Sequence, residues 1–174
     1  MPHPSRAPIL DFRDQTTQTP LDPRLVGLWS AQGRTYEIRA DGSYFVQESL
    51  PFSLTSGGQR LDWGGMLFDR LSGDPAEVSG HWLSTGQDED VLMRTDGTYV
   101  WHVANSFPDA LGEWAVAGNR IDSAELRASI TTSGSEISFD AVFGGTSTGT
   151  YALGNGDQTL TVTLGGTPVV FTRV

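Results

Sequence analysis

The sequence predicts an all-β protein: a single antiparallel barrel of eight to ten strands, preceded by an irregular N-terminal segment. Three observations lead to this prediction: short stretches of alternating polar and apolar residues, 21 glycines in 174 residues, and two short phrases that recur along the chain. Alternation favours β-strands, and frequent glycines favour the tight turns that join them. No stretch keeps helical spacing beyond about two turns.

The first recurring phrase places a glycine two residues before an aromatic residue, and the second is Asp-Gly-Ser/Thr-Tyr. Asp-Gly between alternating segments is a strong signal for a hairpin turn. The two phrases keep their order, so they form an internal repeat, which together with the strand-rich pattern predicts a closed barrel. The copies are Gly27–Trp29, Gly80–Trp82, Gly112–Trp114 and Gly149–Tyr151 for the first phrase, and Asp41–Tyr44 and Asp96–Tyr99 for the second.

Reading the alternation in order gives fourteen candidate strands, several of which are expected to merge or prove short. Two separate small barrels are disfavoured, because the stretch from Trp29 to Trp82 holds only about five short strands, too few to close. We therefore expect one barrel domain over residues 25–174. The candidate strands are 26–31, 34–40, 43–49, 59–63, 65–70, 79–84, 89–94, 98–104, 111–117, 119–127, 136–143, 148–153, 158–164 and 168–174.

Residues 1–24 form a separate, proline-rich segment in which regular structure is not expected. The apolar stretch Ile9–Phe12 leaves two interpretations open: a disordered leader, or a lid that closes the mouth of the barrel. The segment lacks the apolar core of a secretory signal, and no run of the chain reaches the roughly 18 apolar residues of a membrane span. A cytoplasmic protein that does not bind membranes is the expectation.

Charge and composition exclude several classes of function. The formal charge of −10 argues against nucleic-acid partners, which need clustered cations. The chain has no cysteine and no lysine, so thiolate catalysis, disulfides and lysine Schiff bases are excluded. His81 and His102 alternate with tryptophans and are expected to point outward, so no metal is expected. No phosphate loop or dinucleotide fingerprint is present, and no cofactor is expected.

Alternate residues of a small barrel point inward, which gives a set of candidate ligand-binding residues. Tyrosine favours a hydrogen-bonding pocket because a buried hydroxyl needs a partner, whereas plain core packing is the alternative for each residue. Glu113 and Asp62, each beside a tryptophan, are weak candidates for a general acid; outward-facing side chains are the alternative. The candidate ligand-binding residues are Tyr36, Tyr44, Trp63, Met66, Tyr99, Trp101 and Phe139.

The Gly-x-Trp phrase at Trp29, together with Arg173 at the end of the last predicted strand, resembles the lipocalin (calycin) barrels. That resemblance implies that Arg173 stacks on Trp29 and closes one end of the barrel. The stretch from Gly80 to Ile121, with its repeated phrases, resembles small bacterial avidin-like barrels, although the biotin-binding pattern is absent.

In its expected barrel architecture, the chain resembles compact lipocalin-like cyclases of actinobacterial natural-product pathways, among them Diels–Alderases. This resemblance implies a cofactor-independent cyclase or isomerase that holds a hydrophobic substrate by shape and hydrogen bonds. A non-catalytic carrier or sequestering protein for an apolar metabolite is the alternative. A protease-inhibitor-like barrel is a third, and a homodimer is a possible assembly.

Overall fold

The computed structural model describes residues 20–86, 89–103 and 108–174. Within them the chain forms fourteen antiparallel strands, each hydrogen-bonded to its neighbours in sequence, and β14 pairs with β1 to close the ring. Two 3-10 turns, η1 (Pro23–Leu25) and η2 (Ser56–Gly58), are the helical elements of this part of the chain. The strands are β1 (Gly27–Ala31), β2 (Arg34–Ile38), β3 (Ser43–Thr55), β4 (Arg60–Trp63), β5 (Met66–Ser72), β6 (Gly80–Ser84), β7 (Glu89–Met93), β8 (Thr98–Val103), β9 (Ala110–Ala117), β10 (Arg120–Ser133), β11 (Glu136–Ala141), β12 (Thr146–Gly154), β13 (Thr159–Leu164) and β14 (Thr167–Arg173).

The all-β prediction is confirmed, and each of the fourteen candidate strands corresponds to one observed strand. The expected merging into eight to ten strands is wrong. The strands stay separate because tight turns break the chain between them, often at a residue with positive φ such as Gly42 or Asn155. Most of the N-terminal segment, including Ile9–Phe12 and the proposed lid, lies outside the described residues.

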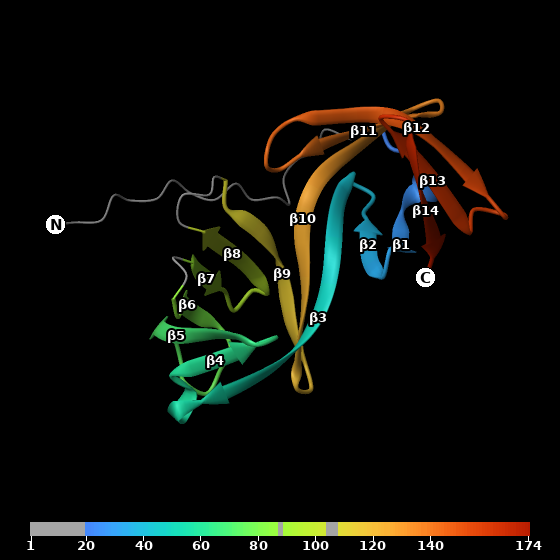
Figure 1. The fold of residues 1–174 in the computed structure, drawn as a ribbon. Coiled ribbons are helices and arrows are strands. Elements are labelled where there is room, and N and C mark those ends of the chain that lie inside the picture. Colours follow the sequence, from blue (N-terminus) through green and yellow to red (C-terminus); the bar gives the residue numbers. More distant parts are fainter. Residues whose placement is uncertain (1–19, 87–88, 104–107) are drawn as a thin grey trace.

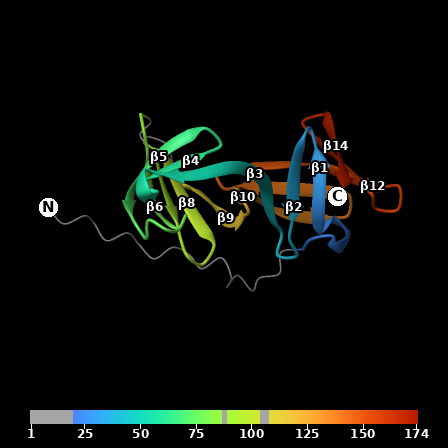
Figure 2. The same cartoon turned by 90° about the horizontal axis from the view of Figure 1, so that it is seen from below.

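A second pairing divides the ring in two. β3 and β10 pair with each other from Ser43–Ser129 to Pro51–Arg120, across the middle of the molecule. Strands β3 to β10 thereby close one eight-stranded ring, called here the inserted ring. Strands β10 to β14 with β1 to β3 close another of eight strands, the terminal ring. Figures 1 and 2 show the two rings side by side, with β3 and β10 running through both.

The expected single barrel is therefore replaced by two rings that share two long strands. The terminal ring is assembled from both ends of the chain, so counting consecutive strands cannot reveal it. The ending predicted for the third strand at residue 49 is also too early. β3 continues through Pro51, which is tolerated because its partner Arg120 is the first residue of β10.

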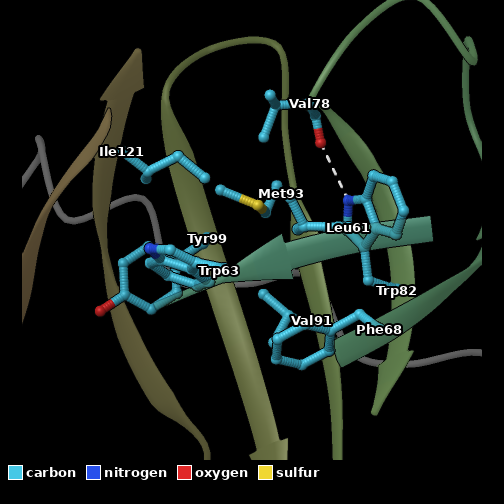
Figure 3. Packing of buried hydrophobic residues seen from close by; sticks show 9 residues of the cluster. All are labelled: Leu61, Trp63, Phe68, Val78, Trp82, Val91, Met93, Tyr99 and Ile121. Carbon is cyan, nitrogen blue, oxygen red and sulfur yellow. Dashed lines mark hydrogen bonds between the residues drawn. The ribbon is translucent and has the colours of Figure 1, made fainter. Parts of the chain in front are cut away.

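Each ring has its own apolar core. In the inserted ring, Trp82 and Phe68 are fully buried and pack with residues from β4, β7, β8 and β10 (Figure 3). In the terminal ring, Trp29 and Ile130 are equally buried, with neighbours from β11, β12 and β13. Two separate cores follow directly from the β3–β10 pairing, because each ring curls around its own set of inward-facing side chains.

The Gly-x-Trp phrase closes both rings in the same way. Arg173 on β14 lies 4.2 Å from the ring centre of Trp29, and Arg70 on β5 lies 4.0 Å from that of Trp82. Stacking of Arg173 on Trp29 is thus confirmed, and a second copy is found in the inserted ring. The glycine makes room for the guanidinium: a Cβ at Gly27 would lie 2.7 Å from Nη1 of Arg173.

The equivalent position in the inserted ring is Gly80, where a Cβ would also lie 2.7 Å from an arginine Nη1, that of Arg70. Each indole N–H donates to a backbone carbonyl four residues earlier, Trp29 to Leu25 at 2.7 Å and Trp82 to Val78 at 2.9 Å. The copies of the phrase at Trp29 and Trp82 are therefore equivalent structural units, one in each ring.

Candidate functional site at the crossing of the rings

Four strands from both rings lie side by side where β3 and β10 pair, in the order β2–β3–β10–β9. We call this segment the crossing. One row of paired residues runs Thr35, Gln47, Ala124 and Glu113, and the next runs Tyr36, Val46, Glu125 and Gly112. Because successive side chains point to opposite faces of a sheet, the two rows face opposite sides. The crossing therefore presents two distinct surfaces.

The face that carries Gln47 and Glu113 is hollowed into an open trough of about 720 Å³. β3 and β10 form its floor, β2 lines the side of the terminal ring, and β9 with the β7–β8 turn lines the side of the inserted ring. Polar side chains dominate the lining. The lining residues are Thr35, Glu37, Arg39, Gln47, Glu48, Ser49, Asp96, Gly97, Thr98, Glu113, Trp114, Ala115, Asp122, Ser123 and Ala124.

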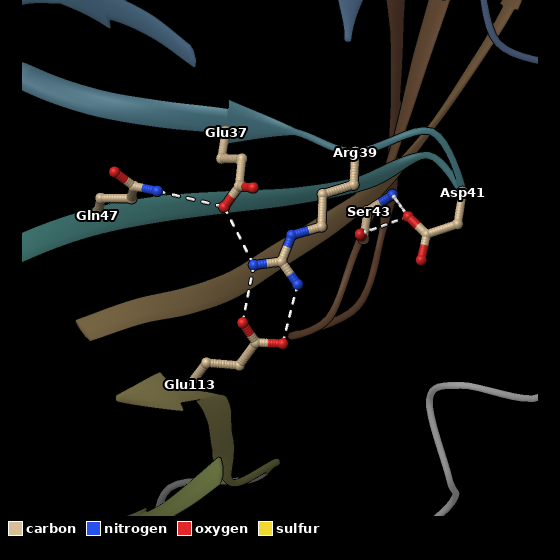
Figure 4. A network of polar contacts seen from close by, with 6 residues as sticks. All are labelled: Glu37, Arg39, Asp41, Ser43, Gln47 and Glu113. Carbon is tan, nitrogen blue, oxygen red and sulfur yellow. Dashed lines mark hydrogen bonds and ion pairs between the residues drawn. The ribbon is translucent and has the colours of Figure 1, made fainter. Parts of the chain in front are cut away.

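Arg39 is the centre of the polar network in this trough (Figure 4). Its guanidinium donates two hydrogen bonds, of 2.9 and 2.8 Å, to the carboxylate of Glu113 and a third, of 3.1 Å, to Glu37. It also lies 4.1 Å from the ring centre of Phe45. The hydrogen bonds that Arg39 donates to Glu113, followed by the one it donates to Glu37, raise the pKa of Arg39. The bidentate pair links the terminal ring to the inserted ring.

This pair gives Glu113 a role other than the general acid that the sequence suggested. Its carboxylate holds Arg39 across the trough, and its side chain is 49% exposed. Asp62, the other catalytic candidate, accepts a hydrogen bond of 2.9 Å from the backbone N–H of Gly65. It therefore fastens the turn between β4 and β5.

The opposite face of the crossing carries tyrosines and a half-buried carboxylate. The ring of Tyr99 on β8 lies over Gly112 on β9, where a Cβ would be only 2.5 Å from its Cε1. Gly112 pairs in turn with Glu125 on β10. Glu125 is 25% exposed and forms an ion pair of 3.2 Å with Arg127.

Burial shifts the acidities on this face. Burial, and next the negative charge of Glu125, raise the pKa of Tyr99. Burial also raises the pKa of Tyr44, with a smaller effect from Tyr36. The pKa of Glu125 itself is raised, chiefly by burial, against the opposing charge of Arg127. Groups whose pKa is shifted by burial are frequent at functional sites, so this face is a second candidate.

The structure divides the predicted ligand-binding residues between the two rings. Tyr36 and Tyr44 stack at 5.6 Å in the terminal ring, and Phe139 packs edge-on against Tyr44. In the inserted ring the indoles of Trp63 and Trp101 lie 5.5 Å apart. The predicted residues Met66, Trp101, Trp63 and Tyr99 all belong to the core cluster of that ring. The seven residues, six of them aromatic, therefore form two separate groups, one in each ring.

Trp63 has an unpaired indole N–H inside the inserted ring. It is 3% exposed, and its indole N–H is the one buried side-chain polar group without a partner in the described part of the chain. Trp101, by contrast, donates a hydrogen bond of 3.0 Å to Glu89. An unpaired buried donor is costly, so Trp63 is a candidate for contact with a bound molecule.

Both histidines of the described residues are paired with carboxylates. His81 lies 2.7 Å from Asp90, and His102 lies 2.6 Å from Asp109. Across residues 20–86, 89–103 and 108–174, no group of three or more His, Asp or Glu side chains has a geometry that could hold a metal ion. The same residues include no helix of the length and apolarity needed to cross a membrane.

A smaller hollow of about 330 Å³ lies beside η1, lined by Asp22, Thr132 and Tyr151 among others. Asp22 accepts hydrogen bonds from Tyr151 at 2.8 Å and from the Arg24 side chain at 2.7 Å. The hydrogen bonds from Arg24 are the largest cause of a pKa of about 2 for Asp22. Its lining residues belong to the terminal ring and its N-terminal approach and do not line the trough.

Sequence reasoning missed Glu125, Arg127 and the role of Arg39. One signal was present for Glu125: within the predicted strand 119–127 it shares a face with Ile121, a residue of the core. A carboxylate on a core-facing position marks a candidate site. No sequence signal pairs Arg39 with Glu113, because they lie 74 residues apart, just after β2 and on β9, and these strands come together only through the crossing.

Comparisons of the chain with family models, with curated proteins and with solved structures found no match.

Proposed function

We propose that the protein binds a polar small molecule in the trough at the crossing. The observation that carries this proposal is the hollow of about 720 Å³ between the two rings. Ligand sites typically measure about 300–1,000 Å³ and are common where two structural units meet. The trough draws side chains from both rings, so a ligand seated there contacts both.

The lining favours a ligand rich in hydrogen-bond donors. Carboxylates from Glu37, Asp96 and Asp122 face the trough, and Arg39 supplies the sole guanidinium among the described residues that line it. Arg39 is already engaged by Glu37 and Glu113, which fixes its position before a ligand arrives. Carboxylates therefore outnumber cationic groups in the trough, and amines or polyols are the matching chemistry.

Titration of the 15N-labelled protein with spermidine and with sorbitol tests this proposal. Amide shifts are expected to concentrate at Gln47, Thr98 and Ala124 with at least one of the two probes. Asp122→Asn should weaken that binding several-fold, because it removes a charged acceptor from the trough. The matched control, Glu136→Gln on the exposed end of β11, should leave it unchanged. Shifts scattered over the surface, or equal effects of the two variants, would contradict the proposal.

A second candidate function is the one the sequence suggested: binding of a hydrophobic molecule, with cyclisation by shape and hydrogen bonding. The aromatic group of the terminal ring favours it, because Tyr36, Tyr44 and Phe139 face the ring and are only partly buried. Phe171 packs edge-on against Tyr36 and extends the group. A non-catalytic carrier of an apolar metabolite uses the same surface.

Deletion of the gene separates the cyclase from the carrier. Loss of a cyclase should make a linear precursor accumulate in the producing cell. Loss of a carrier should change export or resistance and leave the carbon skeleton of the product intact. Purified Tyr44→Ala protein that binds apolar probes as tightly as the wild type would rule out the terminal-ring surface for both functions.

A further inference from the structure

The face of the crossing opposite the trough holds a tyrosine hydroxyl and a carboxylate that the proposed polar-ligand site does not use. Tyr99, Gly112 and Glu125 form one row across three neighbouring strands, β8, β9 and β10. In Figure 3 the hydroxyl of Tyr99 points out of the core cluster, away from Trp82 and Phe68. Among the residues that the structure describes, none forms a hydrogen bond with this hydroxyl.

Gly112 is what allows this arrangement. A Cβ there would lie 2.4 Å from the carbonyl oxygen of Ala124 and 2.5 Å from Tyr99. Its backbone is not in the left-handed region, so the requirement is for space and not for glycine's conformational freedom. The empty position lets the phenol ring cross β9 toward β10, the strand that carries Glu125.

Glu125 is accessible but poorly solvated. Its side chain is 25% exposed, and the neighbouring Arg127, at 3.2 Å, is 41% exposed. Glu48 on β3 and Arg127 are the other charged groups that act on both Glu125 and Tyr99. A second unpaired donor, the indole N–H of Trp63, belongs to the same core cluster as Tyr99. Glu125 therefore supplies a carboxylate on the face that also carries the Tyr99 hydroxyl.

We propose that Glu125 and Tyr99 form a proton-transfer site for small ketones with an acidic C–H bond. The Glu125 carboxylate accepts a proton from the carbon next to the carbonyl group of a β,γ-unsaturated ketone. The electron pair of that C–H bond passes into a dienolate, whose oxygen accepts a hydrogen bond from the Tyr99 hydroxyl. The protonated Glu125 then returns the proton to the γ-carbon. The product is the conjugated ketone, and nothing else is consumed.

The chemistry has a physical basis in the two side chains. A carboxylate that is withdrawn from water is a stronger base than one in solution. A hydroxyl already aimed at the developing oxyanion stabilises charge without needing to reorganise. A positioned base contributes about 10²–10⁴-fold to the rate of such a step.

The test uses 5-nitrobenzisoxazole, a probe from which a carboxylate removes a proton as the N–O bond breaks to give a coloured phenolate. We expect the wild-type protein to exceed acetate at equal concentration, and Glu125→Gln to lose about 100-fold of that rate. Tyr99→Phe should lose several-fold, because the phenolate oxygen then lacks its donor. The control Glu136→Gln should keep the full rate.

The conversion of 3-cyclohexenone to 2-cyclohexenone, followed by ultraviolet absorbance, then tests the ketone class itself. Circular dichroism confirms that each variant is folded. A wild-type rate no higher than that of acetate, or a Glu125→Gln rate equal to wild type, would overturn the proposal. Because these residues face away from the trough, the result is independent of the binding tests with spermidine and sorbitol.

Discussion

The two rings are closed by the same contacts and differ in the surroundings of one tyrosine in each. In both rings an arginine stacks on a buried tryptophan and donates to three backbone carbonyls: Arg173 to those of Asp157, Val26 and Arg24, and Arg70 to those of Gly58, Ser79 and Glu77. The Asp-Gly turns also match. Asp41 accepts from the backbone N–H of Ser43, and Asp96 from that of Thr98, both at 2.9 Å.

The tyrosines that end the two turns have different neighbours. Tyr44 pairs with Ala128 and stacks on Tyr36, which makes it part of an aromatic group. Tyr99 pairs with Gly112, so its ring crosses that position toward Glu125. The repeat thus builds both rings, whereas one residue on the neighbouring strand decides whether the tyrosine ring stacks on another aromatic ring or extends across that strand toward a carboxylate.

The largest expected effect tests whether the buried tryptophans Trp29 and Trp82 stabilise their two rings equally. Trp29→Ala and Trp82→Ala each remove a fully buried indole and should each lower the free energy of unfolding by about 3–5 kcal/mol. Denaturant unfolding of both variants provides the measurement. A cost below about 1 kcal/mol for either tryptophan, the range of ordinary surface substitutions, would break the equivalence.

The next largest effect is expected for the two arginines that stack on these tryptophans. Arg173→Met and Arg70→Met keep much of the packing but remove the guanidinium, and should cost about 2–3 kcal/mol through lost stacking and unpaired carbonyls. Burial lowers the pKa of Arg70, so part of its charge is poorly solvated in the fold. Arg70→Met should therefore be the milder of the two in the same unfolding experiment. The reverse order would show that the two arginines have different roles.

A pH effect should appear in the terminal ring through Asp22. Its folded pKa, about 2, lies below the ordinary value of 3.8, so its ionised form stabilises the fold above pH about 4. That contribution is lost as the pH falls toward 2. Asp22→Asn should cost about 1–2 kcal/mol at pH 7 and almost nothing at pH 2. Denaturant unfolding of both proteins between pH 2 and pH 7 measures this cost. A difference in unfolding free energy that stays constant over that range would contradict the assignment.

The smallest expected effect concerns the link between the rings. Arg39 and Glu113 are partly exposed, so their pair should contribute only about 0.2–1 kcal/mol. A double-mutant cycle with Arg39→Met and Glu113→Gln measures the coupling. It should weaken in high salt, because exposed charges are screened. Zero coupling at low salt would mean that the two rings are held together by β3 and β10 alone.

Much of the fold could be predicted from the sequence because local patterns determine it. Alternation located all fourteen strands, and the resemblance of the Gly-x-Trp phrase and Arg173 to lipocalin barrels implied the closure of one ring. The closure by Arg70 was missed because that arginine precedes its tryptophan in the sequence, whereas Arg173 comes after its own. The two-ring division depends on β3–β10 pairing between residues about 80 positions apart, which no local pattern encodes.

The candidate site was predicted only in part, for a related reason. Tyr36, Tyr44 and Tyr99 are on inward faces, as alternation required. Their assignment to one cavity assumed one ring, and two rings separate them. Glu125 and Arg127 fall where β10 passes from one ring to the other, with a register irregularity between Leu126 and Ala128. The residue types in the sequence do not reveal such a register irregularity.

The division into two rings depends on the pairing of β3 with β10, and a thiol cross-link tests that pairing directly because the chain has no cysteine of its own. Gln47 and Ala124 are direct partners in that pairing, so their Cα atoms lie within the range that a disulfide spans. Oxidation of Gln47→Cys/Ala124→Cys should give an intramolecular disulfide in nearly all molecules. Thr35→Cys/Ala124→Cys, with β3 between the two positions, should give none. Absence of the first cross-link, or equal yields for the two pairs, would contradict the two-ring fold.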